Sequence, residues 1–347
     1  MAGRTKTITT ALAVLLCCGA AAQRLDWRLS FDGLFDNREY KNDMIPQTIY
    51  GMRAMPEVSL SSGSTTLTAG FSVISEFGAR EDDPMKDLIL YFTARKGSWT
   101  AYFGNIPRYH LLRQLPDAML YDSIAYFEPM IGGTLFQYRN TLLSSEVYCN
   151  WTGRQSDTRR EAFRIVWDGY VRTGGWLDGG WFATMTHYAK PKEPGHYIYE
   201  QMQFNPYLRM RVPTGSTGIG ISAEAGVLTS LVRCRRDESW HSPTGFLGNL
   251  HIGWWMFDLS STIYKGDSQQ PFLNDPEAGL AFHRSDPFYN HTFYNRTGLE
   301  VTLFADRNLD FSFRWNMHFT PDTPVHNQQL ITVKHRTGSS ARPVRRR

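Results

Sequence analysis

The chain has 347 residues, of which 14% are aromatic and 4 are cysteine, and its 37 Lys and Arg residues slightly outnumber its 33 Asp and Glu residues. Disordered chains contain few aromatic residues and carry a large net charge, collagens repeat glycine, and disulfide scaffolds are short and rich in cysteine. The composition excludes these classes and predicts a folded chain whose aromatic rings supply much of the apolar surface.

The first 22 residues have the pattern of a secretory signal peptide. Arg4 and Lys6 supply a positive start, residues 8–18 an apolar run, and Ala22 ends a small-residue cleavage site. The apolar run is shorter than the roughly 18 residues that a spanning helix needs. We therefore expect residues 1–22 to be a signal peptide and not a membrane anchor.

Cleavage would leave two cysteines, Cys149 and Cys234. One disulfide and two buried thiols both remain open, whereas the spacing does not match a zinc site. We expect no metal and no cofactor. The excess of basic residues lies at the C-terminus, where residues 337–347 are expected to form a basic disordered tail. The body of the chain therefore gives no reason to expect nucleic-acid binding.

Apolar and polar residues alternate along most of the remaining sequence. Leu25, Trp27, Leu29 and Phe31 are separated by polar residues, and the same period of two recurs over residues 309–319. A strand with this period places each set on its own face. The pattern predicts about sixteen strands: 25–36, 45–60, 65–77, 87–96, 98–104, 131–139, 142–151, 161–171, 176–189, 199–212, 217–229, 246–257, 258–265, 293–305, 308–319 and 328–336.

The connections between these strands alternate in length. The gap after each even strand is short, and the gap after each odd strand is longer and polar, with the longest at residues 105–130 and 266–292. Transmembrane barrels have short periplasmic turns and long outer loops, and tryptophans at strand ends fit their aromatic girdles, although aromatic residues favour strands in general. We expect residues 23–336 to form an all-β, transmembrane antiparallel β-barrel of about 16 strands.

Sixteen strands with a long third outer loop resemble the general porins of outer membranes. Two segments, residues 35–41 (FDNREYK) and residues 104–108 (GNIPR), are similar to porin-like barrel proteins of Bacteroides-type bacteria. The resemblance implies a channel fold without a particular substrate. The chain departs from the pattern at its C-terminus, because outer-membrane barrels usually close on a strand that ends in an aromatic residue read by the barrel assembly machinery.

Alternation also assigns charged side chains to the inside of the barrel, because an Arg facing lipid at mid-depth costs about 2–4 kcal/mol. A network of salt bridges that fills a narrow lumen is the alternative to an open, charged wall. The expected pore-lining residues are Arg28, Arg53, Arg164, Arg209, Arg211, Arg314, Asp310, Glu300 and Glu146.

The third outer loop of general porins resembles a flap that folds into the lumen, and here it corresponds to residues 105–130. Charged rings at a constriction select ions by sign, and both signs occur in this loop, so we expect a transverse field and not strong selectivity. A loop that stays outside the pore is the alternative. The expected constriction residues are Arg108, His110, Arg113, Asp117, Asp122 and Glu128.

We expect a porin-like channel for passive diffusion of small hydrophilic solutes, in the outer membrane of a Gram-negative bacterium and surrounded by its lipid. Whether the barrel forms a homotrimer stays open. The alternative is a plugged surface barrel whose outer loops bind glycan, capsule or a protein partner, with Tyr289, Phe293 and Tyr294 placed to stack on sugars. Residues 215–218 lack the spacing of a nucleophile elbow and the histidines are scattered, so we expect no enzyme activity.

Overall fold

The computed structural model describes residues 23–339, except residues 42–43, 45, 79–84, 213–217 and 238. The expected signal peptide, residues 1–22, and most of the expected tail, residues 340–347, lie outside the described residues.

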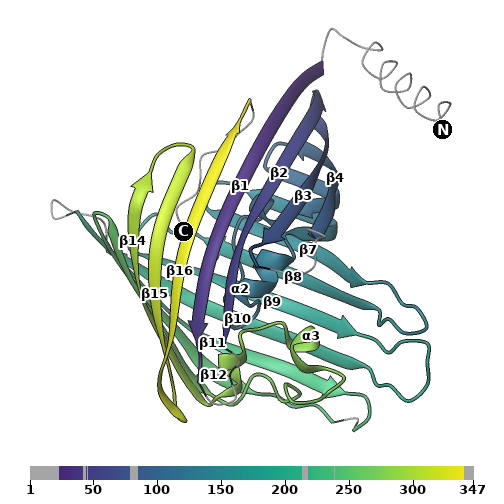
Figure 1. Cartoon of the computed structure of the whole chain (residues 1–347), viewed down its shortest axis with the longest axis vertical. Coiled ribbons are helices and arrows are strands. Elements are labelled where there is room, and N and C mark those ends of the chain that lie inside the picture. The colour runs from purple at the N-terminus through teal and green to yellow at the C-terminus, as the bar shows by residue number, and fades with distance from the viewer. Residues whose placement is uncertain are drawn as a thin grey trace.

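The described residues form sixteen strands that close into one antiparallel barrel, as expected from the alternating pattern (Figure 1). Each strand pairs with its neighbour in the chain, and β1 pairs with β16 from Arg28 opposite Gly338 to Glu39 opposite Asn327. The strands are β1 (Gln23–Glu39), β2 (Gln47–Ser62), β3 (Thr65–Glu76), β4 (Met85–Lys96), β5 (Trp99–Pro107), β6 (Met130–Arg139), β7 (Leu143–Gly153), β8 (Ala162–Val171), β9 (Leu177–Tyr188), β10 (Tyr199–Val212), β11 (Ile219–Cys234), β12 (Thr244–Trp254), β13 (Phe257–Gly266), β14 (Phe293–Ala305), β15 (Leu309–Thr320) and β16 (Thr323–Gly338).

The last hairpin differs from the expected pattern. A polar loop was expected over residues 320–327, but β15 ends at Thr320 and β16 begins at Thr323. Residues 320–327 are mostly polar and include Pro324, which is typical of a loop. In the structure they continue the ladder instead: His326 pairs with His318 and Thr323 pairs with Thr320, with a register shift between these two pairs. At the other end β16 runs to Gly338, two residues beyond the expected end of the barrel at 336.

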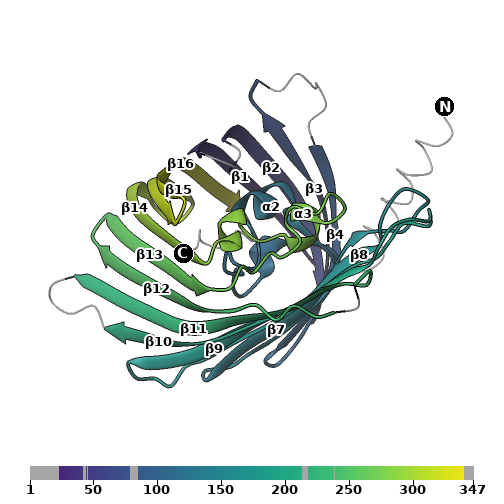
Figure 2. The same cartoon turned by 90° about the horizontal axis from the view of Figure 1, so that it is seen from below.

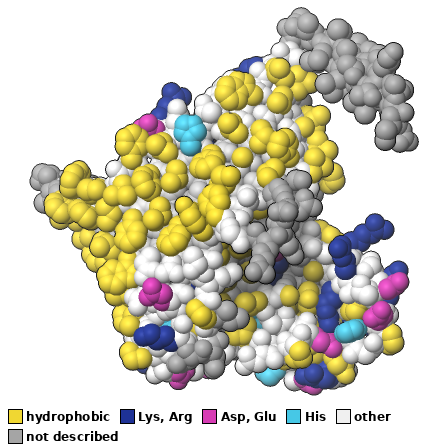
Figure 3. All heavy atoms as spheres, viewed as in Figure 1, with side chains coloured by type: hydrophobic (Ala, Val, Ile, Leu, Met, Phe, Trp, Pro, Cys, Tyr) yellow, Lys and Arg dark blue, Asp and Glu magenta, His cyan; other side chains and the backbone are white. Residues whose placement is uncertain are grey.

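The two faces of the strands have opposite character. Large apolar residues such as Trp27, Phe103 and Leu208 are more than half exposed on the outside, whereas Asp26 and Ser30 are buried on the inside. Figure 3 shows hydrophobic side chains over much of the barrel wall, with charged side chains gathered toward the end that carries the long loops. An outer apolar band with a polar interior is the pattern of a barrel in a bilayer.

The helices among the described residues are short and lie in the two longest connections. They are η1 (Arg108–His110), α2 (Asp122–Phe127), α3 (Gly279–His283) and η2 (Pro287–Asn290). In the described part of the chain, no helix is long and apolar enough to cross a membrane. Seen along the barrel, both connections lie inside the ring of strands (Figure 2). We name residues 108–129 the first inner loop and residues 267–292 the second inner loop.

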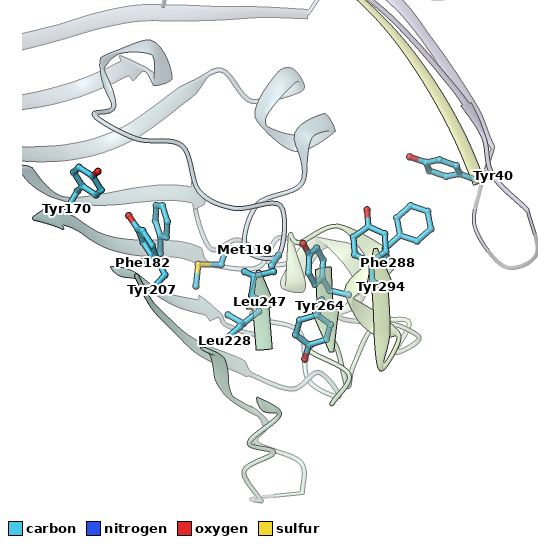
Figure 4. Close-up of a cluster of buried hydrophobic side chains, with 12 residues drawn as sticks. Tyr40, Met119, Tyr170, Phe182, Tyr207, Leu228, Leu247, Tyr264, Phe288 and Tyr294 are labelled. Carbon is cyan, nitrogen blue, oxygen red and sulfur yellow. The ribbon is translucent and has the colours of Figure 1, made fainter. Parts of the chain in front are cut away.

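The largest buried apolar cluster joins these loops to the wall. Met119 of the first inner loop packs among inward side chains of β8 to β13, including Phe182 and Leu228, and Phe288 of the second inner loop packs beside Tyr294 (Figure 4). The core of this protein therefore sits inside the barrel, where loop residues cover the inner wall.

Candidate functional site: the cavity beneath the inner loops

The first inner loop enters the lumen, as the resemblance to general porins implied. The loop begins after β5 ends at Pro107. Within β5, Gly104 has a φ of +127°, and a Cβ added there would lie 2.2 Å from the Leu90 carbonyl oxygen, so this position accepts only glycine. Residues 105–107 still pair with β6, and the first inner loop follows them into the lumen.

Three arginines of β1 and β2 fasten the loop to one side of the barrel. The guanidinium of Arg28 stacks 4.8 Å from the Tyr109 ring centre, that of Arg38 lies 4.9 Å from the Tyr121 ring, and that of Arg53 lies 4.8 Å from the Tyr126 ring. Arg38 also donates a 2.6 Å hydrogen bond to the Tyr121 hydroxyl. Stacks of this kind stabilise by about 0.5–2 kcal/mol each, so together they hold the loop against this wall.

The same loop is bound to the wall formed by β7 to β10. The Glu146 carboxylate accepts the backbone N–H groups of Leu112, at 2.9 Å, and of Arg113, at 3.2 Å. The Arg113 guanidinium lies 4.2 Å from the Phe182 ring centre and 5.1 Å from that of Tyr207. The loop therefore spans the lumen and is attached on both sides.

The second inner loop is attached to the first. The backbone N–H of Tyr121 donates to the Arg284 carbonyl at 2.8 Å, and that of Asp286 donates to the Asp117 carbonyl at 2.9 Å. The Arg284 side chain also pairs with the Glu128 carboxylate. The two loops therefore form one body inside the barrel.

This second insertion was missed by the sequence reasoning, which placed residues 266–292 outside the barrel. Tyr289 and Tyr294 were candidates for stacking on sugars, but they are 2% and 1% exposed and belong to the inner core. The concentration of aromatic residues in one long loop was the available signal, since a solvated loop seldom carries so many apolar rings.

A cavity of about 350 Å³ remains between the first inner loop and the wall formed by β1, β2 and β12 to β16. Acidic and basic side chains are mixed in its lining. The charged lining residues are Asp32, Asp36, Arg38, Arg53, Arg108, Asp122, Asp258, Glu300, Asp310, Arg314 and Lys334.

The nine residues expected to line a pore do not share one place. Arg53, Arg314, Asp310 and Glu300 lie on the cavity, where the Arg314 Nε donates to Glu300 at 2.6 Å. The others lie elsewhere on the inner wall: Arg28 on Tyr109, Glu146 under the loop backbone, Arg164 fully buried, Arg209 paired with Glu224 and Arg211 paired with Asp178. Conduction past these side chains stays a prediction.

The expected constriction residues are likewise divided. Arg108 and Asp122 line the cavity, whereas Arg113 is enclosed by rings, Asp117 pairs with Arg296, and Glu128 pairs with Arg284. His110 is buried, and its Nε2 lies 2.8 Å from the Tyr91 hydroxyl, which itself lies 3.5 Å from Glu57.

One carboxyl group between the inner loops has an unusual pKa. Burial, together with the negative charge of Asp117, raises the pKa of Asp286 to about 7. Its carboxylate accepts the backbone N–H of Phe288 at 3.1 Å at the start of η2. The cysteines are separate free thiols. Among the described residues, no group of three or more His, Cys, Asp or Glu side chains is arranged to hold a metal ion.

A family model described as lipid A 3'-O-deacylase-type matches residues 19–174 of this chain. The match ends just after β8 and so covers the first eight of the sixteen strands. It corrects the expectation that the chain is not an enzyme, because this family is defined by an enzymatic activity. No sequence motif pointed to this family, since the groups of an active site can come from separate strands. A comparison with curated protein sequences found no match.

Solved outer-membrane proteins share the fold at low sequence identity. OccAB1 of Acinetobacter baumannii is 8% identical, with 91% of this chain and 97% of that chain covered and a TM-score of 0.57. OprD of Pseudomonas aeruginosa is 11% identical, with 91% and 95% covered and a TM-score of 0.56. The outer membrane protein opdK of Pseudomonas aeruginosa is 11% identical, with 91% and 99% covered and a TM-score of 0.54.

These likenesses establish the fold class, a closed antiparallel barrel of the kind found in outer-membrane porins. The narrower resemblance to Bacteroides-type proteins is not confirmed, because the matched family has a different name and these structures come from Pseudomonas and Acinetobacter.

Proposed function

We propose that the protein is a channel of the Gram-negative outer membrane through which small hydrophilic solutes diffuse. The observation that carries the proposal is the charged cavity left between the first inner loop and the wall of β1, β2 and β12 to β16. A polar, water-accessible space beside a loop that narrows the barrel is the arrangement through which porins pass solutes. The low-identity likeness to solved outer-membrane proteins supports the location.

The cavity favours neither sign strongly, since its lining contains both acids and bases. A solute with separated charges would find both signs of charge in the lining. The positive charge is that of Arg314, which lies beside Glu300 on the wall, and Asp122 adds a negative charge on the loop. The attachments of the loop to both walls limit the bore, so solutes larger than the cavity would require the loop to move.

The test is single-channel conductance of the refolded protein in a planar bilayer, with a salt gradient. Consecutive serines provide a matched pair in a Cys149→Ser background: Ser260 lines the cavity, whereas Ser261 lies on the opposite face of β13 and contacts Thr297. A charged thiol reagent should reduce the conductance of Ser260→Cys and leave that of Ser261→Cys unchanged. A folded barrel that passes no steady current would favour the plugged surface barrel instead.

A second candidate function is hydrolysis of a lipid A acyl ester, which the family match over residues 19–174 favours. Ester hydrolysis needs a group that takes a proton from the attacking oxygen, and histidine does this most often. His110 is the one histidine within the matched residues, and it is oriented by the Tyr91 hydroxyl. We therefore assign it the role of general base in this candidate.

Release of fatty acid from lipid A by the protein in detergent micelles tests this candidate. The wild-type protein should release fatty acid over time, and His110→Gln should abolish the release while retaining the heat-modifiable migration of a folded barrel. Equal release by the two proteins would remove His110 from the reaction, and no release by either would remove the activity.

A further inference from the structure

Arg164 is buried on the inner face of β8 without a carboxylate partner among the described residues. Its side chain is 5% exposed, and its one hydrogen bond runs from Nη2 to the Gln203 amide oxygen at 3.4 Å. Its Nε and Nη1 atoms have no hydrogen-bond partner. A buried guanidinium in this state is unusual, since buried charges are normally paired, and an anion is the partner that would satisfy it.

The residues beside Arg164 in the same row of the wall share this property. Thr186 of β9 is directly opposite Arg164, and Gln201 of β10 is directly opposite Thr186. The Thr186 hydroxyl and both amide atoms of Gln201 are buried without partners. Three neighbouring inward side chains therefore all have unused hydrogen-bonding capacity.

Two further arginines, Arg108 and Arg284, belong to the inner loops and share Glu128 as a partner. Arg108 donates from Nε to the Glu128 backbone carbonyl at 2.7 Å, and Arg284 pairs with the Glu128 carboxylate. Both loop arginines therefore meet at Glu128, whereas among the described residues Arg164 has no ion pair with a carboxylate and bonds only to Gln203. Arg284 has a left-handed backbone with φ of 57°, which is unfavourable for a side chain larger than glycine and shows that the loop holds it in place.

The cluster has an entrance from the cavity. Arg108 and Tyr148 both line the cavity, and Tyr148 is a diagonal neighbour of Arg164, because Asn150, two residues further along β7, is directly opposite Arg164. Burial, with the charge of Arg284 adding to its effect, lowers the pKa of Arg108. A negative charge at this end of the cavity would relieve the repulsion among the three arginines.

We propose that Arg108, Arg164 and Arg284 form an internal binding site for one small oxyanion of the phosphate class. Three guanidinium groups and the Glu128 carboxylate, the one carboxylate paired with any of them among the described residues, leave two positive charges, which a phosphate dianion balances. This proposal depends neither on conduction nor on ester hydrolysis, because anion binding requires only that the anion reaches the cavity.

Isothermal titration of the refolded barrel with inorganic phosphate, at constant ionic strength in a zwitterionic detergent, tests the site. We expect saturable binding of one phosphate, weakened about tenfold or more by Arg108→Gln, which removes a charge-assisted donor. Arg235→Gln is the matched control, because Arg235 pairs with Glu200 and is 47% exposed in its side chain. Its binding constant should equal that of the wild type.

Glu128→Gln should change the phosphate affinity in the opposite direction from Arg108→Gln. A variant that fails to fold would not bind more tightly, so this result cannot come from misfolding. Removing the one carboxylate should strengthen phosphate binding about threefold or more. Glycerol phosphate distinguishes the source of the anion: equal binding identifies the phosphate end of a larger solute, and binding of inorganic phosphate alone identifies the free ion. Absence of saturable binding to the folded protein, or equal constants for Arg108→Gln, Glu128→Gln and Arg235→Gln, would overturn the proposal.

Discussion

Asp286 should make the packing of the inner loops depend on pH. Its carboxyl group has a pKa of about 7 in the folded protein and returns to about 3.8 in the unfolded chain. The folded state therefore binds the proton more tightly, and stability falls as the pH rises from about 4 to about 7. A pKa difference of about 3 corresponds to a loss of at most about 4 kcal/mol across that range.

The raised pKa of Asp286 has a local cause, and one substitution removes the titrating carboxyl group. Asp286 is 2% exposed, its backbone N–H donates to Asp117, and the positive charge of Arg296 is shared with Asp117. Asp286→Asn keeps an oxygen that can accept the N–H of Phe288 and is neutral at every pH. The stability of the variant should exceed that of the wild type by an amount that grows from pH 4.5 to pH 8.

Urea unfolding in detergent micelles, followed by tryptophan fluorescence from pH 4.5 to pH 9, measures the difference. Asp286→Ala is the matched control, because it removes the same charge and also the cap of η2. It should be less stable than Asp286→Asn by about 1 kcal/mol at every pH. If the difference between Asp286→Asn and the wild type stays constant over this range, the buried-carboxyl argument is refuted.

Three other substitutions test the Gly104 position in β5, the first inner loop and the cavity. Gly104→Ala should lower the urea midpoint by the equivalent of about 2 kcal/mol, because an added Cβ would collide with the facing backbone of β4 where φ is +127°. Tyr121→Phe removes the 2.6 Å hydrogen bond from Arg38 and should make single-channel records switch more often, whereas unchanged switching would show that the first inner loop is held elsewhere. Glu300→Gln leaves Arg314 without its partner on the cavity and should move the reversal potential toward anion preference, and a shift toward cations would contradict the assignment.

The two inner loops are connected more extensively than a single flap would require. Asp117 and Tyr121 of the first loop bond to Asp286 and Arg284 of the second. A movement that widens the cavity therefore has to move both loops together or break these bonds. The pH dependence of Asp286 acts at this junction, so its ionisation should loosen the contact between the loops.

The strands and their faces were predictable from the residues alone. A period of two is a local property, so the alternation at Leu25, Trp27 and Leu29 is sufficient to define a strand and its outer face. The regular alternation of short and long connections predicted the closed barrel, because transmembrane barrels have short turns at one end and long loops at the other.

The interior depended on contacts that no local pattern contains. Phe288 and Tyr294 appear in sequence as aromatic residues of an outer loop and a strand. The barrel brings Phe288 against Tyr40 and His318, and it stacks Tyr294 on Phe288 and His318. Likewise Arg108 and Arg284 are distant in sequence, and they meet at Glu128 only because both loops enter the barrel. Strand pairing depends on neighbouring residues along the ladder. The packing of the two inner loops depends instead on contacts between residues on opposite sides of the lumen, and these contacts exist only in the closed barrel.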